Sequence, residues 1–155
     1  MSQEQVQQAQ DSKKGKEYTK ARNQIAIVWY IGSLILLIVL IFQVLNGRYG
    51  SEYQIPFQWM TPHVLPTIGL ITGVIIVENT RVIRSNAAKK IANLFLYRLC
   101  LWTSVLHVSL LNISIFIQPF TPLEPLELME FVNYILWFIQ GTVSAFLGVF
   151  FVRSK

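Results

Sequence analysis

The chain has 155 residues, of which 53% are hydrophobic and 14% are charged, with a formal net charge of +5. Soluble domains carry roughly 25% charged residues, so this composition is typical of a membrane protein with room for one domain. A single cysteine, Cys100, excludes a disulfide framework or a cysteine metal site within one chain. The basic residues flank apolar segments, which explains the net charge as a topology signal and argues against nucleic acid as a partner.

The N-terminal segment, residues 1–24, is polar and rich in glutamine, and it includes five basic residues. Such a segment buries too little apolar surface to fold alone, so we expect disorder or a frayed helix. Our preferred interpretation is an orientation signal that stays in the cytoplasm. The alternative is a docking segment for a cytoplasmic protein partner or for anionic lipid.

Four apolar segments are long enough to cross a bilayer, which takes roughly 20 residues of helix. They cover about 25–45, 57–77, 92–117 and 129–152. The first segment has no charged residue and is longer than the apolar core of a signal peptide. No small-residue cleavage site follows it, so the pattern predicts a retained anchor helix.

Basic residues lie before the first span, between the second and third, and after the fourth, whereas the other two loops are mostly acidic. This alternation predicts that both termini are cytoplasmic. We therefore predict an all-α integral membrane domain over residues 25–155, a bundle of four transmembrane helices. The expected location is the cell membrane, plasma or inner, as a multi-pass protein in contact with the lipid bilayer.

The first span offers few small or polar residues for packing. We expect it to be the outermost, lipid-facing helix, with the other three spans forming the packed core. A conservative change in it, such as Ile38→Ala, should then have little effect.

The second span carries Pro62, Pro66, Gly69 and Gly73 within about 60° of one another on a helix. Gly69 and Gly73 have the small-xxx-small spacing that lets helices approach closely. The prolines predict a bend in the outer half, which is tolerable where a neighbour or water satisfies the freed carbonyls. This stripe is expected to face protein or water.

Polar residues recur on one face of the third span and on one face of the fourth. Within a membrane such residues usually turn toward the bundle interior or a water-filled cavity, although serines often only hydrogen-bond between helices. The candidate residues that line a pore or a subunit interface are His63, Thr67, Ser104, His107, Ser114, Gln140 and Ser144. The candidate residues for helix packing and kinks are Pro62, Pro66, Gly69, Gly73, Gly141 and Gly148.

His63 and His107 are the only two histidines. At 1.5 Å per residue they lie roughly 9 Å and 15 Å below the outer ends of their antiparallel spans, so they can meet or share a ligand. Three functional interpretations are axial ligation of one b-type haem, a proton relay and a pH-dependent pore. Our preferred interpretation is the simpler one, two neutral histidines hydrogen-bonded inside the bundle. We expect no metal and no cofactor, with haem kept as an alternative.

The chain contains no G-x-S-x-G, P-loop or H-E-x-x-H motif, so we do not expect an enzyme. No span has a carboxylate at its middle, which argues against a proton-driven exchanger built around an intramembrane acid. The leading hypothesis is a self-associating subunit, a homo-oligomer, that forms a narrow pore or channel-like assembly. His107→Leu or Ser104→Leu should then change conductance or assembly. The alternatives are a membrane scaffold or accessory subunit that docks a cytoplasmic partner, and a small transporter or di-histidine b-haem protein.

Overall fold

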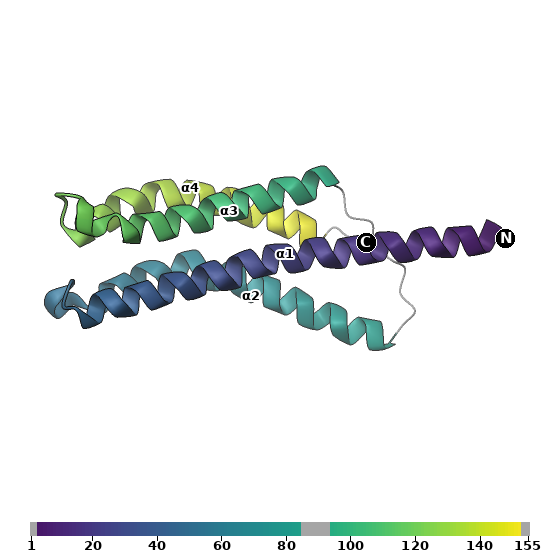
Figure 1. Ribbon diagram of the computed structural model, residues 1–155, viewed down its shortest axis with the longest axis horizontal. Coiled ribbons are helices and arrows are strands. Elements are labelled where there is room, and N and C mark those ends of the chain that lie inside the picture. The colour runs from purple at the N-terminus through teal and green to yellow at the C-terminus, as the bar shows by residue number, and fades with distance from the viewer. Residues whose placement is uncertain (1–2, 85–93, 153–155) are drawn as a thin grey trace.

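The computed structural model describes residues 3–84 and 94–152, and the side chains of residues 19–77 and 95–151 (Figure 1). Over this part the chain is all-helical. The long helices are α1 (Gln3–Leu45), α2 (Ile55–Arg84), α3 (Leu94–Phe116) and α4 (Pro125–Val152). Two single 3-10 turns, η1 (Gly50–Glu52) and η2 (Gln118–Phe120), lie in the α1–α2 and α3–α4 connections.

All four long helices are apolar enough and long enough to cross a membrane. The apolar portions are Thr19–Leu45, Gly50–Val77, Phe95–Phe116 and Pro125–Phe151. The predicted four-helix bundle is confirmed at this level, because the four apolar helices pack against one another. α1 also runs without a break from the polar residue Gln3 into its apolar portion, and its N-terminal end projects beyond the bundle (Figure 1).

The helices form a ring in which α1 packs on α2 and α3, and α4 packs on the other sides of the same two helices. The prediction that the first span is outermost is wrong. α1 and α4 contact α3 to the same extent. Four large side chains of α1 are buried inside the bundle: Ile25, Trp29, Leu36 and Leu40. The prediction relied on the scarcity of small and polar residues in this span, whereas α1 packs mainly through large apolar side chains, with one glycine at its crossing with α3.

That glycine is Gly32, where α1 and α3 approach most closely. A Cβ atom built on Gly32 would overlap the Cγ1 atom of Val108 on α3. Asn112, one turn further along α3, donates a hydrogen bond from Nδ2 to the Gly32 carbonyl at 3.2 Å. Only a residue without a side chain fits this crossing, so Gly32 sets the α1–α3 distance.

Buried apolar side chains form two clusters along the bundle axis. The N-terminal-end cluster consists of Ala21, Ile25, Ala26, Trp29, Ile71, Cys100, Val108, Val143, Leu147, Phe150 and Phe151. The loop-end cluster, near the α1–α2 and α3–α4 connections, consists of Leu36, Leu40, Tyr49, Trp59, Val64, Leu111, Ile115, Met129 and Leu136. Buried polar side chains lie where the two clusters meet, and they form the candidate site.

The proline–glycine stripe of α2 faces outward. Pro62, Pro66, Gly69 and Gly73 are all exposed, and a Cβ atom on either glycine would meet no atom within 4 Å. The stripe therefore does not pack inside a single chain. Both prolines lie within α2, and this helix starts beside α1 and diverges from it toward its C-terminal end (Figure 1).

The glycines of α4 behave in the same way as those of α2. Gly141 is exposed and Gly148 is half-buried, and neither would bring a Cβ atom within 4 Å of a neighbour. The expected role of these glycines in packing is not met by contacts within one chain, so any close approach at them involves another molecule.

Candidate functional site at the bundle centre

Most of the predicted lining residues lie inside the bundle of a single chain. The buried ones are His63, Thr67, Ser104, His107 and Ser114. Gln140 is half-buried, whereas Ser144 is exposed on α4. The polar faces of α2, α3 and α4 therefore converge on the bundle axis, and only Ser144 remains on the outer surface.

The two histidines meet across the centre of the bundle. His63 comes from α2 and His107 from α3, helices that lie diagonally opposite in the ring. Their ring centroids are 6.0 Å apart, and their side chains are 1% and 0% exposed, respectively. The structure therefore brings together the one pair of imidazoles that the chain possesses.

His63 is held by a hydrogen bond to α4. Its Nε2 atom lies 2.8 Å from Oδ1 of Asn133. Because a carboxamide oxygen can only accept, Nε2 carries the proton and Nδ1 of the neutral ring is an acceptor. That Nδ1 atom is buried and has no hydrogen-bond partner among the described residues.

Asn133 is a site residue that the sequence argument did not include among its candidates. It lies seven residues before Gln140, so the two share one face of α4. This spacing was the available signal. The structure confirms the shared face, because Gln140 donates from Nε2 to Oγ1 of Thr67 on α2 at 3.1 Å. Two polar bonds thus join α2 to α4.

His107 is the least satisfied group in the described part of the chain. Both of its ring nitrogens are buried without a hydrogen-bond partner there. Ser104 lies three residues earlier on α3, and its buried hydroxyl also lacks a partner. The indole of Trp29 on α1 packs at 5.6 Å from the imidazole of His107, between ring centroids, and its nitrogen is unpartnered as well.

We call this group the central polar layer, which consists of Trp29, His63, Thr67, Ser104, His107, Asn133 and Gln140. On α3 it falls between Cys100 of the N-terminal-end cluster and Leu111 of the loop-end cluster. An unpaired buried polar group costs about 1–3 kcal/mol. The groups of the layer are therefore suited to a non-protein partner such as water, a proton or a small polar solute.

The haem alternative would need a porphyrin between the two imidazoles. Indole rings already lie against both of them, Trp59 at 5.6 Å from His63 and Trp29 at 5.6 Å from His107. A porphyrin would have to displace these rings and the Asn133 bond. Among the described residues, no group of three or more His, Cys, Asp or Glu side chains is placed to hold a metal ion.

A second buried polar group, the loop-end network, ties the two connections together. The Tyr49 hydroxyl donates to Oε1 of Gln43 at 2.6 Å and lies 2.8 Å from Oε1 of Gln118. Arg48 donates to the Gln118 carbonyl at 2.7 Å, and Gln43 donates to the Ile115 carbonyl at 3.0 Å. Burial raises the pKa of Tyr49 to about 12, so the phenol remains a donor at neutral pH.

The chain matches no protein-family model, no curated protein and no solved structure. Its chemistry is therefore argued from its own side chains. The two facing imidazoles can accept and donate protons. Together with the two hydroxyls and the two amides of the layer, they can also hydrogen-bond a small polar species.

Proposed function

We propose that the chain is an integral membrane protein, with both termini in the cytoplasm, that self-associates and passes a proton or a water-sized polar species along a narrow path. The path runs through the interior of each four-helix bundle, with the central polar layer at its middle. The two apolar clusters act as closed constrictions on either side, in the manner of channels that gate by dewetting. No catalytic role is proposed.

The outer surface supports membrane insertion. Large apolar side chains are exposed on every span, among them Leu45 (80%), Phe95 (73%) and Phe138 (81%). Soluble monomers rarely expose contiguous apolar patches beyond a few hundred Å². The clustering of basic residues at the N-terminal end of the bundle supports the cytoplasmic orientation of that end.

The unpartnered imidazole of His107 carries the proposal. A histidine that only stabilised the bundle would have its ring nitrogens bonded to protein, as Nε2 of His63 is. Neither ring nitrogen of His107 makes a hydrogen bond of ordinary geometry to a described residue, although the side chain is fully buried where the two apolar clusters meet. Ionisable side chains inside a membrane commonly mark ion pathways and proton relays.

The exposed small residues of α2 and α4 support self-association. The exposed small residues are Gly69 and Gly73 on α2 and Gly141 and Ser144 on α4. A Cβ atom added at any of the three glycines would have no neighbouring atom within 4 Å, so another helix has room to approach there. Close helix approach through small residues drives association in lipid, where apolar side chains alone give no preference. The path itself does not need the subunit interface, because its polar residues are buried in each chain.

The test is proton flux into liposomes that contain the purified full-length chain. Flux through the original chain should fall at least tenfold in His107→Leu, and it should be unchanged in Ile38→Ala, a change at an exposed position of α1. Flux at the level of empty liposomes for the original chain would reject conduction. Equal flux for the original chain and the His107→Leu variant would reject a path that depends on His107. Native mass spectrometry of the same samples reports the number of copies.

A second candidate function is an accessory or scaffold subunit that docks a cytoplasmic partner. The observation that favours it is the projection of α1 beyond the other helices, as far as Gln3 (Figure 1). Deleting residues 2–18 distinguishes the two functions. Loss of a defined partner with unchanged proton flux and assembly mass supports docking, whereas loss of flux does not.

A further inference from the structure

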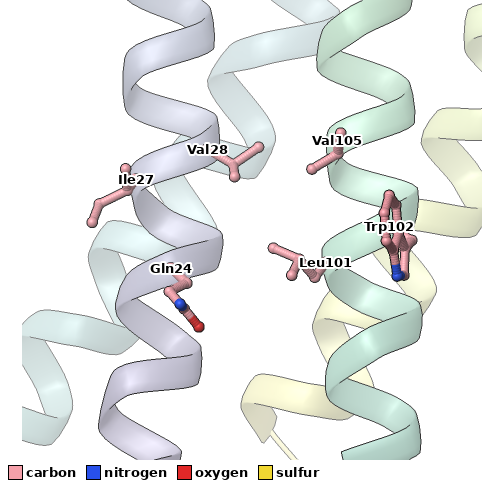
Figure 2. Close-up of a pocket in the computed structure, with 6 residues that line it drawn as sticks. All are labelled: Gln24, Ile27, Val28, Leu101, Trp102 and Val105. Carbon is pink, nitrogen blue, oxygen red and sulfur yellow. The ribbon is translucent and has the colours of Figure 1, made fainter.

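A groove lies on the outer surface between α1 and α3, away from the central polar layer. It is lined by Gln24, Ile27, Val28, Leu101, Trp102 and Val105 and has a volume of about 380 Å³ (Figure 2). This volume is within the roughly 300–1,000 Å³ of small-molecule sites. The groove opens outward on a bundle whose outer surface is apolar, so its natural surroundings are lipid chains.

The groove has an apolar body and one polar end. Val28 projects from α1 toward Leu101 and Val105 on α3, and Gln24 lies toward the N-terminal end of the bundle (Figure 2). The Tyr97 hydroxyl donates to Oε1 of Gln24 at 2.6 Å. That bond occupies the amide oxygen, so the NH₂ group is the end of the side chain that can donate to a ligand.

Two basic side chains flank the polar end. Lys20 lies four residues before Gln24 on α1, and Arg98 lies four residues before Trp102 on α3, so each shares a helix face with a groove residue. Both are exposed. α1 and α3 run in the same direction (Figure 1), so the two cations lie at the same end of the groove.

We propose that this groove binds one anionic phospholipid. An acyl chain lies along Val28, Leu101 and Val105, and the phosphate lies at the mouth, between Lys20, Arg98 and the Gln24 amide. The apolar length selects a lipid over free phosphate, and the two cations select an anionic headgroup over a zwitterionic one. The inference rests on the proposed membrane insertion and does not depend on conduction.

The test uses the full-length chain in nanodiscs that contain equal amounts of phosphatidylglycerol and phosphatidylcholine. Native mass spectrometry then counts the lipids retained as the nanodisc is removed. The original chain should retain one phosphatidylglycerol per copy in preference to phosphatidylcholine. In the double variant Lys20→Gln/Arg98→Gln that preference should fall roughly 30-fold, since each surface cation contributes about a factor of five.

Two control variants separate the site from general effects. Lys13→Gln/Lys14→Gln removes the same charge from α1, roughly 10 Å from Lys20, and should keep the preference. Val28→Trp fills the groove and should abolish retention of both lipids, whereas Leu106→Trp adds the same ring at an exposed position outside the groove and should not.

Several outcomes would overturn the proposal. Equal retention of the two lipids by the original chain would remove headgroup selection, and an unchanged preference in Lys20→Gln/Arg98→Gln would place the lipid elsewhere. A dimer that Val28→Trp dissociates would assign the groove to a second copy of the chain. Selective retention in a protein that shows no proton flux would reject conduction and leave the lipid site supported.

Discussion

The central polar layer and the loop-end network both contain buried polar side chains, yet they differ in how their polar atoms are paired. In the network, Arg48, Tyr49 and Gln43 all donate to protein acceptors, and only Nε2 of Gln118 lacks a partner. A half-turn of the Gln118 amide would let that nitrogen donate to the Tyr49 hydroxyl. In the layer, six atoms on five side chains have no partner among the described residues: Trp29 Nε1, His63 Nδ1, Ser104 Oγ, both ring nitrogens of His107 and Gln140 Oε1.

This difference distinguishes a polar cluster whose groups are paired within the protein from one whose groups are largely unpaired. Paired groups of the loop-end network stabilise one arrangement of the two connections, because each broken bond leaves a buried partner unsatisfied. Unpaired groups of the central layer do not stabilise the bundle, and natural proteins retain such groups mainly where activity needs them. Substitutions in the two regions should therefore change stability in different ways.

The largest effect is expected at the crossing of α1 and α3 at Gly32. Gly32→Leu places a side chain where Val108 already lies, and it should lower the free energy of unfolding by about 3 kcal/mol, the upper end of ordinary overpacking. The measurement is thermal unfolding in a detergent that keeps the chain monomeric. Gly69→Leu is the matched control: its Cβ meets nothing, so monomer stability should be retained, and equal losses would contradict the α1–α3 crossing.

In the loop-end network, Tyr49→Phe removes the hydroxyl that joins Gln43 to Gln118. The free energy of unfolding should fall by about 1–3 kcal/mol, because buried amide oxygens lose their donor. Denaturant or thermal unfolding gives the value. Tyr53→Phe serves as the control, since Tyr53 is exposed, and should change stability by less than about 0.5 kcal/mol.

In the central polar layer, His107→Leu should leave the free energy of unfolding within about 1 kcal/mol of its original value, or raise it. The reason is that the change replaces two unpaired nitrogens by apolar atoms of similar volume. Leu111→Ala, a cavity-forming change one turn away, should cost about 2–5 kcal/mol in the same assay. A loss as large as that for His107→Leu would make His107 a structural residue.

The smallest effect is a pH dependence of stability that belongs to Tyr49. Its pKa is raised from 10.0 to about 12 in the folded chain, so the unfolded chain loses the phenolic proton first. The neutral Tyr49 phenol therefore makes its full contribution to the free energy of unfolding below pH 10, and this contribution is lost as the pH rises toward 12. The difference in unfolding temperature between the original chain and Tyr49→Phe should shrink over that range. A constant difference would mean that burial does not hold the phenol neutral.

The sequence predicted the helices well because twenty-residue apolar segments are determined locally. It placed α1 wrongly, since the contribution of Gly32 lies in the absence of a side chain and depends on Val108 of another helix. It placed His63 and His107 in the same half of the membrane, but the ring order of four helices decides that they meet across the bundle centre. Asn133 illustrates the same limit, because its role depends on which face of α4 turns toward His63.

The most direct measurement is solid-state NMR of the histidine-labelled chain in lipid bilayers. The only two histidines both lie in the central polar layer, so histidine labelling reports on that layer alone. The account predicts magnetisation transfer from water to the imidazole nitrogens of His107, together with exchange of its ring proton into D₂O. A polar path through the bundle would be contradicted if the imidazole nitrogens received no magnetisation from water and the ring proton did not exchange into D₂O.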